Sequence, residues 1–288
     1  NEQITVMESA QSGADVRPAG LDFSVGDILL KTGAVLSARD LGLAAAMNVP
    51  WLRVRRRPRV AIVATGDEVM MPGDPIGADQ IVSSNSIALA AIVRVLGGEP
   101  LGLGIARDTD ASLRQVLSGA KGADVLVTIG GASVGDYDLV QKVMAEDGLD
   151  LNFYKVAMRP GKPLIFGRWK DIPVLGLPGN PVSAGVTSAI FLRAAINVML
   201  GIGDGGLGTE KARLGCDVKA NGMRQEFMRA TLDTDSEGNL VTTPFDRQDS
   251  AMMASFASAD CLVIRPVDAP SAQAGDIVEI VRFDTGLS

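Results

Sequence analysis

The chain has 288 residues, 47% of them apolar, with a formal net charge of −7 at pH 7 and no histidine. The missing histidine excludes catalytic triads, cysteine–histidine dyads and histidine-ligated metals built from this chain alone, and the acidic balance argues against a nucleic-acid partner. Two distant cysteines, Cys216 and Cys261, have no metal-like spacing and are typical of a reduced, cytoplasmic protein.

Residues 1–56 look like the remainder of a domain that precedes a sheet domain. A short strand is expected at residues 27–31, and Ser37 and Asp40 have the spacing of a capping box ahead of an alanine-rich helix. A basic run at 53–59 ends this region, and we interpret it as a solvated linker rather than a ligand site. The chain does not begin with methionine and shows no signal peptide, so we expect part of a longer protein.

Residues 57–201 alternate strand and helix patterns, which indicates an α/β domain. Strands are expected at 60–64, 101–105, 125–129, 153–157, 164–167 and 174–177, and helices at 85–96, 109–121, 137–146 and 181–200. Such alternation predicts a mostly parallel sheet in three layers, covered by helices on both faces. The last helix is apolar, but its polar residues favour a buried core helix over a membrane span, so no membrane partner is expected.

Residues 202–288 begin with a glycine-rich linker and continue without a long helix. Strands are expected at 212–218, 226–232, 240–244, 261–265 and 277–282. The pattern predicts a small C-terminal β domain of sandwich or barrel type. We interpret its polar segments, 224–229 and 250–258, as solvent-exposed.

The polar loops of the α/β domain come directly after its predicted strands. Thr65-Gly-Asp-Glu68 follows the first strand, Asp108 the second, Gly130-Gly-Ala-Ser-Val-Gly-Asp-Tyr-Asp138 the third, and Pro178-Gly-Asn-Pro181 the last. Because ligands bind at the carboxyl ends of parallel strands, we expect these loops to meet at one edge of the sheet. Glycines there let backbone N–H groups approach an anion closely, which indicates a phosphorylated ligand.

The acidic residues of these loops suggest a cation. Glu68, Asp108 and Asp138 would bring three carboxylates into one crevice, which is costly unless a cation compensates. A Mg²⁺ ion between carboxylates and a phosphate is the simplest compensation. The alternatives are that Asp108 only caps the next helix, that residues 67–68 form an ordinary polar turn, and that the glycines serve only a tight turn.

Two further segments are rigid and suited to anions. Arg159 and Lys162 are held between prolines at 160 and 163, a clamp suited to a tetrahedral oxyanion or phosphate. The alternative is a strand connection with exposed basic tips. Pro181 begins a long helix whose free N–H groups favour an anion, the alternative being simple helix initiation.

Together these segments resemble the molybdopterin molybdenumtransferases, the family that includes the C-terminal enzyme domain of gephyrin. The matching segments are Thr65-Gly-Asp-Glu68, Ser84-Asn85, Gly130-Gly-Ala-Ser-Val-Gly-Asp-Tyr-Asp138, Lys155-Val-Ala-Met-Arg-Pro-Gly-Lys-Pro163 and Gly176-Leu-Pro-Gly-Asn-Pro-Val-Ser183. The resemblance implies Mg²⁺-dependent insertion of molybdate into adenylylated molybdopterin, with release of AMP. It also implies a cytoplasmic homodimer, with a molybdopterin adenylyltransferase as a possible partner.

The resemblance implies roles for the matching residues. The pterin phosphate and nucleotide would be bound by Thr65, Gly66, Asp67, Glu68, Asn85, Gly130, Gly131, Ser133, Gly135 and Asp136, and the substrate would also contact Pro178, Gly179, Asn180 and Pro181. The molybdate pocket would comprise Arg159, Lys162, Pro163, Ser183, Arg224 and Ser255. Asp108 and Asp138 would hold Mg²⁺. The catalytic set would be Glu68, Asp108, Asp138, Lys155, Arg159 and Lys162, and Asp22 matches an acidic position before the sheet domain.

The sequence also departs from the family pattern. Position 159 is Arg where many relatives have Lys, which keeps the charge but changes its geometry. Residues 251–260 match only loosely. The family's N-terminal lid domain, which completes the site across a dimer, is mostly absent, so we expect ligand binding with poor turnover. Two other interpretations stay open: a molybdopterin adenylyltransferase or nucleotide hydrolase on the same sheet domain, and a non-catalytic scaffold protein.

Overall fold

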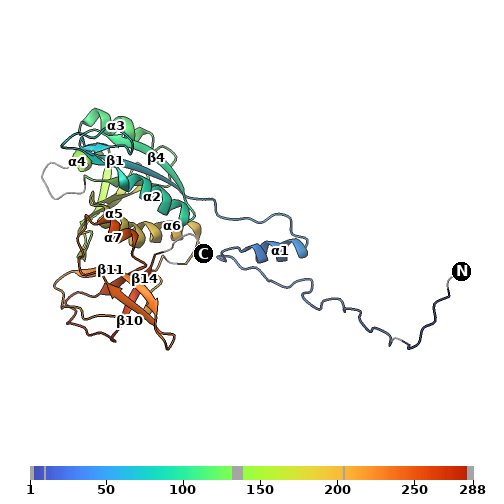
Figure 1. The fold of residues 1–288 in the computed structure, drawn as a ribbon. Helices are drawn as coiled ribbons and strands as arrows, with labels where there is room; N and C mark the ends of the chain where they lie inside the picture. Colours follow the sequence, from blue (N-terminus) through green and yellow to red (C-terminus); the bar gives the residue numbers. More distant parts are fainter. Residues whose placement is uncertain (1–2, 10, 132–138, 204, 284–288) are drawn as a thin grey trace. The chain divides into compact units, whose positions relative to one another are not determined.

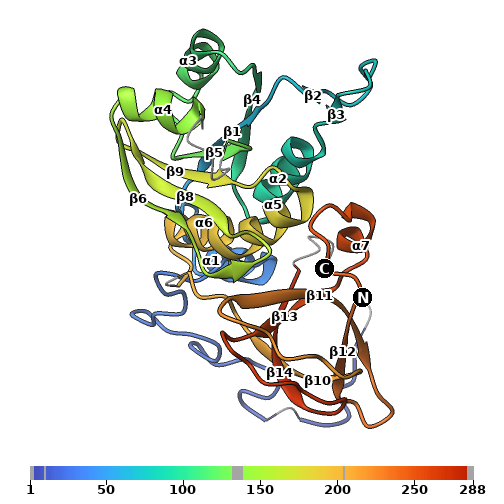
Figure 2. The same cartoon turned by 90° about the vertical axis from the view of Figure 1, so that its left-hand side faces the viewer.

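The computed structural model describes residues 3–9, 11–131, 139–203 and 205–283 (Figures 1 and 2). The chain divides into two units, Asn1–Arg53 and Val54–Ser288. The second unit contains both the sheet domain and the β domain.

The first unit contains one helix, α1 (Ala38–Ala46), and no strand among its described residues. The predicted capping box is confirmed, because the Ser37 N–H donates to Asp40 Oδ2 at 2.7 Å and the Asp40 N–H donates to Ser37 Oγ at 3.4 Å. The strand expected at 27–31 is wrong. The Asp27 carboxylate instead accepts the Ser24 N–H at 2.7 Å and closes a turn, and none of the described residues of this unit forms a strand that could pair with it.

The sheet domain is built on a six-stranded sheet in the order β4-β1-β5-β9-β8-β6. Its strands are β1 (Arg59–Thr65), β4 (Glu99–Ala106), β5 (Val125–Ile129), β6 (Leu149–Lys155), β8 (Pro163–Trp169) and β9 (Ile172–Leu177). The first four in spatial order run parallel, and β8 is antiparallel to both of its neighbours. The predicted mostly parallel sheet is therefore confirmed. A small ribbon of β2 (Val69–Met70) and β3 (Ile81–Val82) was not expected from the sequence.

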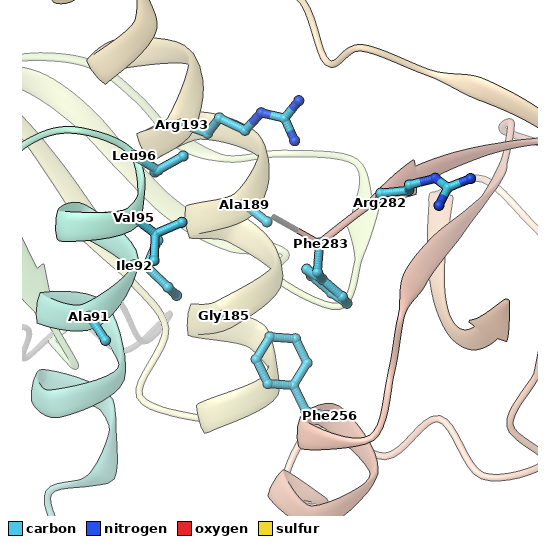
Figure 3. A pocket seen from close by; sticks show the side chains of 10 residues that line it. All are labelled: Ala91, Ile92, Val95, Leu96, Gly185, Ala189, Arg193, Phe256, Arg282 and Phe283. Carbon is cyan, nitrogen blue, oxygen red and sulfur yellow. The ribbon is translucent and has the colours of Figure 1, made fainter. Parts of the chain in front are cut away.

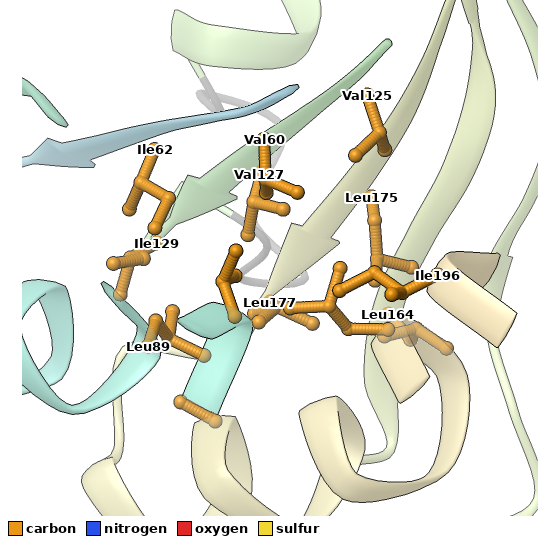
Figure 4. Close-up of a cluster of buried hydrophobic side chains, with 13 residues drawn as sticks. Val60, Ile62, Leu89, Val125, Val127, Ile129, Leu164, Leu175, Leu177 and Ile196 are labelled. Carbon is orange, nitrogen blue, oxygen red and sulfur yellow. The ribbon is translucent and has the colours of Figure 1, made fainter. Parts of the chain in front are cut away.

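Alternate residues of the central strands feed two separate cores, one on each face of the sheet. Val60, Ile62, Val127 and Leu177 pack on one face (Figure 4), against α2 (Ser84–Val95) and the closing helix. Residues of the opposite parity pack on the other face, against α3 (Asp110–Ser118) and α4 (Leu139–Glu146). Both faces are covered, as parallel strands require, and this explains why the strands read as continuous apolar runs.

The closing helix runs as α5 (Pro181–Thr187), a π-helical turn η1 (Ser188–Leu192) and α6 (Arg193–Leu200). The whole segment is long and apolar enough to cross a membrane, but more than half of it is buried inside the protein. Val186 and Ile190 contact the β domain, whereas Ala184 and Ile196 contact the sheet. The helix is therefore shared by two cores, which accounts for its apolar composition.

The β domain is a closed barrel of five strands. They are β10 (Glu210–Leu214), β11 (Gln225–Thr234), β12 (Leu240–Pro244), β13 (Cys261–Arg265) and β14 (Ile277–Arg282). The spatial order is β12-β10-β14-β13-β11, and the barrel closes because β12, the first strand in this order, also pairs with β11, the last. Of the two predicted forms, sandwich and barrel, the structure has the barrel. A short helix, α7 (Met253–Ala257), joins β12 to β13.

A two-residue strand of the sheet domain, β7 (Met158–Arg159), pairs in parallel with β11 of the barrel. Met158 is opposite Gln225 and Arg159 is opposite Glu226. Next to this pairing, Met158 packs with Phe227 of β11 and Val182 of α5 in a shared apolar cluster. Backbone hydrogen bonds and apolar burial therefore hold the barrel on the sheet domain.

The basic run at 53–59 is only partly a solvated linker. Arg56 Nη1 donates to Asp124 Oδ2 at 2.6 Å, and the Arg59 N–H donates to the same oxygen at 2.7 Å. The hydrogen bond from Arg56 lowers the pKa of the Asp124 carboxyl below its usual value, and the Arg59 N–H acts in the same direction. Asp124 thus fastens the incoming chain beside the start of β5.

We expect Asp124→Asn to destabilise the protein at neutral pH but not in acid. A carboxyl whose pKa is lowered by folding contributes stability above its unfolded pKa and loses it as the pH falls through the folded value. Urea unfolding at pH 7 should give a lower midpoint for the variant, and the gap to wild type should close below about pH 4. The matched control is Asp74→Asn in an exposed turn, and a gap that is equal at pH 7 and pH 3 would contradict the assignment.

Candidate functional site

In the turn after β1, the Glu68 carboxylate lies against Gly66. Gly66 has a φ of 132° and donates its N–H to Ala106 O at 3.2 Å, which ties the ends of β1 and β4 together. A Cβ atom at Gly66 would lie 2.6 Å from Glu68 Oε2. The backbone conformation is the reason that glycine is favoured at position 66, because the exposed Glu68 carboxylate ends a flexible side chain that can move aside.

Asp67 and Asp108 bind each other's backbone. The Asp108 N–H donates to Asp67 Oδ1 at 3.2 Å, and the Asp67 N–H donates to Asp108 Oδ2 at 3.4 Å. The N-cap of α3 is Thr109, whose Oγ1 accepts the Ser112 N–H. The alternative that Asp108 caps this helix is therefore wrong, and Asp108 joins the ends of two neighbouring strands.

The glycine-rich loop after β5 begins against the end of β1. Gly130 and Gly131 have φ values of 85° and 64°. A Cβ atom at Gly130 would lie 3.1 Å from Thr65 Oγ1, and Gly130 donates its N–H to Leu177 O at 3.1 Å. Thr65 Oγ1 in turn donates to Ile129 O at 3.3 Å. The remaining predicted residues of this loop lie outside the described residues: Ser133, Gly135, Asp136 and Asp138.

The turn at 178–181 joins the same edge. The Asn85 side-chain amide, on the first turn of α2, donates to Gly179 O at 2.7 Å. A Cβ atom at Gly179 would lie 3.8 Å from Gly130 Cα, so the two loops lie side by side. Pro181 is the first residue of α5, and Asn180 donates from its side chain to Ser250 Oγ of the barrel domain at 3.0 Å. The predicted meeting of these loops is confirmed for the described residues.

We call this set of loops the acidic edge. It comprises Thr65, Gly66, Asp67, Glu68, Asn85, Asp108, Gly130, Gly131 and the turn 178–181.

The acidic edge offers ligands for a hard cation. The described hydrogen bonds use one oxygen each of Asp67 and Asp108. Among the residues that the structure describes, no group of three acidic or thiol side chains is close enough to hold a metal alone. Mg²⁺ is typically held by one or two carboxylates together with substrate phosphates, so the donor set at this edge fits Mg²⁺ only when a phosphate is bound.

A cleft of about 720 Å³ lies where the sheet domain meets the barrel. Four cationic side chains line it: Lys155, Arg159 and Lys162 from the sheet domain, and Arg224 from the segment that leads into β11. The backbone fixes both walls, because the Gln225 N–H donates to Ala157 O at 2.9 Å and the Val156 N–H donates to Lys162 O at 3.0 Å. We call it the cationic cleft, and its charge favours a small polyanion.

The loop that carries Arg159 and Lys162 rests directly on α5. Gly161 has a φ of 98°, and a Cβ atom there would overlap the methyl group of Thr187. Glycine is therefore required both by the backbone conformation and by the close approach to the helix.

Glu226 is a residue of the cleft that the sequence analysis missed. Arg159 Nη1 donates to Glu226 Oε1 at 3.2 Å, and the Arg159 side chain is 57% exposed against 21% for Glu226. The segment 224–229 was interpreted as solvent-exposed, but its first residues line the cleft. The alternation of charged Arg224 and Glu226 ahead of buried Phe227 is the signal that could have placed them on a strand beside the cleft.

Some predicted residues of the molybdate pocket are not among the described residues that line the cleft. Ser183 is only 5% exposed in the first turn of α5, and Pro163 begins β8. Ser255 lies half-buried on α7. Asp22 belongs to the first unit.

An apolar pocket of about 160 Å³ lies between α2, the closing helix and the barrel (Figure 3). Phe256 and Phe283 meet edge to face there, with ring centroids 5.2 Å apart. A Cβ atom at Gly185 would overlap the Phe256 ring, so a glycine lets the aromatic pair sit against α5. We interpret this pocket as part of the packing between the domains.

Comparisons with known proteins decide the family. The family described as "Probable molybdopterin binding domain" matches residues 61–197, and "MoeA C-terminal region (domain IV)" matches residues 211–283. A molybdopterin molybdenumtransferase 2 from Mycobacterium tuberculosis is 33% identical over 285 residues, which cover 97% of this chain and 70% of that protein. The chain belongs to the molybdopterin molybdenumtransferase family.

Further relatives agree with this assignment. A molybdopterin molybdenumtransferase from Nostoc sp. is 38% identical over 209 residues, covering 71% of this chain and 48% of that protein. The crystal structure of a molybdopterin biosynthesis protein, moeA, from Pyrococcus horikoshii superposes with a TM-score of 0.77 at 32% identity, covering 91% of this chain and 64% of that chain. The chain thus spans between 48% and 70% of these curated relatives. The family resemblance and the fold expected from it are confirmed.

We expect Gly161→Ala to be more destabilising than Gly148→Ala. Both glycines have a positive φ, but a Cβ atom at Gly148 would meet nothing within 4 Å, whereas one at Gly161 would overlap Thr187. The added overlap should cost about 1–3 kcal/mol beyond the backbone strain common to both variants. Urea unfolding measures the difference. Thr187→Ser removes the obstructing methyl group and should recover part of the loss, and equal costs for the two alanine variants would contradict this packing.

Proposed function

We propose that this molybdopterin molybdenumtransferase family member inserts molybdate into adenylylated molybdopterin with Mg²⁺ and releases AMP. The observation that carries the proposal is that one helix supports both candidate half-sites. Pro181 of α5 belongs to the acidic edge, and Thr187 of α5 lies under the loop of the cationic cleft. Six residues of α-helix rise about 9 Å, so a single substrate can reach from one half-site to the other.

The acidic edge is suited to the adenylylated phosphates. Gly130 and Gly131 turn the chain at the end of β5 with positive φ values and without side chains, which leaves room for an anion to approach the backbone closely. Thr65 and Asn85 act on the loops, since their described hydrogen bonds run to Ile129 O and Gly179 O. We propose that Asp67 and Asp108 hold Mg²⁺ together with phosphate oxygens, and that Asp138 joins them, as the family resemblance implies.

When bound, Mg²⁺ would neutralise charge on the phosphates as AMP departs. The carboxylates of Asp67 and Asp108 are already fixed by each other's N–H groups, so little side-chain freedom is lost when the cation is held. Their mutual bonds also keep two strand ends in register around the phosphates.

The cationic cleft is suited to molybdate, a tetrahedral dianion. Lys155 and Lys162 approach from the sheet domain and Arg224 from the barrel, so an oxyanion between them is held from both sides. Arg159 is already paired with Glu226, which orients its guanidinium before the anion arrives. Holding the dianion beside the activated substrate supplies proximity rather than covalent chemistry.

The finer assignments rest on the family likeness. We propose that the protein acts as a homodimer in the cytoplasm, and that a molybdopterin adenylyltransferase supplies its substrate. The direct test is AMP release from adenylylated molybdopterin by the complete protein, with and without molybdate. Molybdate-dependent release supports the proposal, whereas ATP consumption in its place favours an adenylyltransferase and no reaction favours a scaffold.

We expect Lys162→Ala and Arg224→Ala each to weaken molybdate binding by about 10- to 100-fold, because each removes a charge-assisted hydrogen bond to the dianion. Isothermal titration with molybdate measures the change. Lys211→Ala, on an exposed position of β10, is the matched control. Unchanged molybdate affinity in both cleft variants would contradict the assignment of this cleft.

We expect Asp108→Asn to weaken Mg²⁺-dependent AMP binding by about tenfold while the fold is retained. The amide oxygen can still accept the Asp67 N–H, so the variant removes charge and keeps the shape. The control is Asp110→Asn, whose carboxylate faces Lys142 at 3.9 Å on the surface of α3 and α4. If the Asp108→Asn variant binds AMP with the same Mg²⁺ dependence as wild type, Asp108 does not bind the cation.

A further inference from the structure

The barrel contains a buried arginine whose described hydrogen bonds all end on neutral acceptors. Arg229 of β11 is 1% exposed. Its guanidinium donates from Nε to Gln248 Oε1 at 3.3 Å, from Nη1 to Met252 O at 3.2 Å and from Nη2 to Arg247 O at 3.2 Å. The Asp249 carboxylate lies close enough to favour the charge of Arg229, but it accepts none of these hydrogen bonds, and burial lowers the pKa of the guanidinium. Burying a guanidinium is costly, so its hydrogen bonds are more than simple packing.

The segment that Arg229 holds is the one that contacts the acidic edge. Its two carbonyl acceptors, on Arg247 and Met252, lie on either side of Ser250. Ser250 O accepts the Val182 N–H at 3.1 Å, and Ser250 Oγ accepts from the Asn180 side chain at 3.0 Å. Both bonds end on the turn 178–181 or on the first turn of α5.

The other hydrogen bonds of the 247–252 segment do not replace those made by the Arg229 guanidinium. The Gln248 side chain donates to Arg229 O and Phe245 O, both at 2.9 Å, and so fixes the stretch before Ser250. Of the bonds named here, only the one from Arg229 Nη1 to Met252 O ties the stretch after Ser250 to the barrel strand. The guanidinium therefore spans the segment and fixes Ser250 between two anchored ends.

We infer that Arg229 is a positioning residue for the acidic edge, acting through Ser250 on the turn 178–181. The position of this turn sets the position of Gly179 O, which accepts a hydrogen bond from the Asn85 side chain at 2.7 Å. It also sets the packing of Gly179 against the neighbouring Gly130. The inference rests on the proposed function in that the ligand concerned is the adenylyl phosphate. Arg229 is inferred to affect the acidic edge, where the phosphate would bind. The cationic cleft is held separately through the pairing of β7 with β11.

The test compares Arg229→Met with Arg265→Met. Arg265 is a second buried arginine of the barrel, 6% exposed, whose guanidinium donates to Pro270 O and not to residues 247–252 among the described contacts. Two quantities are measured on each variant. The first is exchange of the Val182 amide in the ligand-free protein, relative to the Val127 amide in the sheet core, and the second is the Kd for AMP with Mg²⁺.

We expect Arg229→Met to speed the relative exchange of the Val182 amide and to raise the Kd for AMP about tenfold, with the Kd for molybdate unchanged within about twofold. Arg229→Lys, which can still reach one carbonyl, should recover part of both effects. Ser250→Ala removes the bond to Asn180 directly and should weaken AMP binding in the same direction, even if Arg229→Met fails to fold.

Several outcomes would overturn the inference. Equal effects of Arg229→Met and Arg265→Met on AMP affinity would show general loosening of the barrel, and a parallel loss of molybdate affinity would show the same. Unchanged exchange at Val182 in Arg229→Met or Arg229→Lys would also reject it. If wild-type protein binds neither AMP nor molybdate, the proposed function fails, while the exchange measurement still decides whether Arg229 holds the turn.

Discussion

The site depends on one short piece of backbone pairing, that of β7 with β11. Two residues of the sheet domain, Met158 and Arg159, lie in register with Gln225 and Glu226 of the barrel. This register places Arg159 beside Glu226 and brings Arg224 to the same cleft as Lys162. A shift by one residue would turn each of these side chains to the opposite face, so the cleft can exist in only one register.

The same strand also reaches the other half of the site. Three residues beyond Glu226, Arg229 turns into the barrel and holds the segment that bonds Asn180 and Val182. On the sheet side, α5 makes the corresponding connection, because its first turn borders the acidic edge and Thr187 supports the cationic loop. Strand β11 and helix α5 thus form a frame that fixes two oppositely charged half-sites, and apolar contacts of Phe227 with Val182 and Val186 hold that frame together.

Much of the sheet domain could be predicted because its signals are local. Strands buried on both faces read as apolar runs, and the polar loops after them had to meet once the strands were parallel. The capping box at Ser37 and Asp40 was equally local and is confirmed. The strand at 27–31 failed because an apolar run becomes a strand only if a neighbour completes its ladder, and the first unit provides none among its described residues.

The parts that sequence did not reveal depend on contacts between distant segments. Glu226 and Arg229 looked like a solvent-exposed stretch until β7 and the 247–252 segment were placed against them. Asp108 stands next to a helix start, so capping was a reasonable local alternative, yet its carboxylate binds the Asp67 N–H, 41 residues away along the chain. The β2–β3 ribbon is likewise too short to leave a pattern of its own.

The most direct test is a crystal structure of the protein soaked with AMP, Mg²⁺ and molybdate. We expect the AMP phosphate at the acidic edge, beside Asp108 and Gly130, and a tetrahedral oxyanion between Lys162 and Arg224, with the two anions on the order of 10 Å apart along α5. An oxyanion bound away from the cationic cleft, or the two ligands on opposite sides of the molecule, would contradict it.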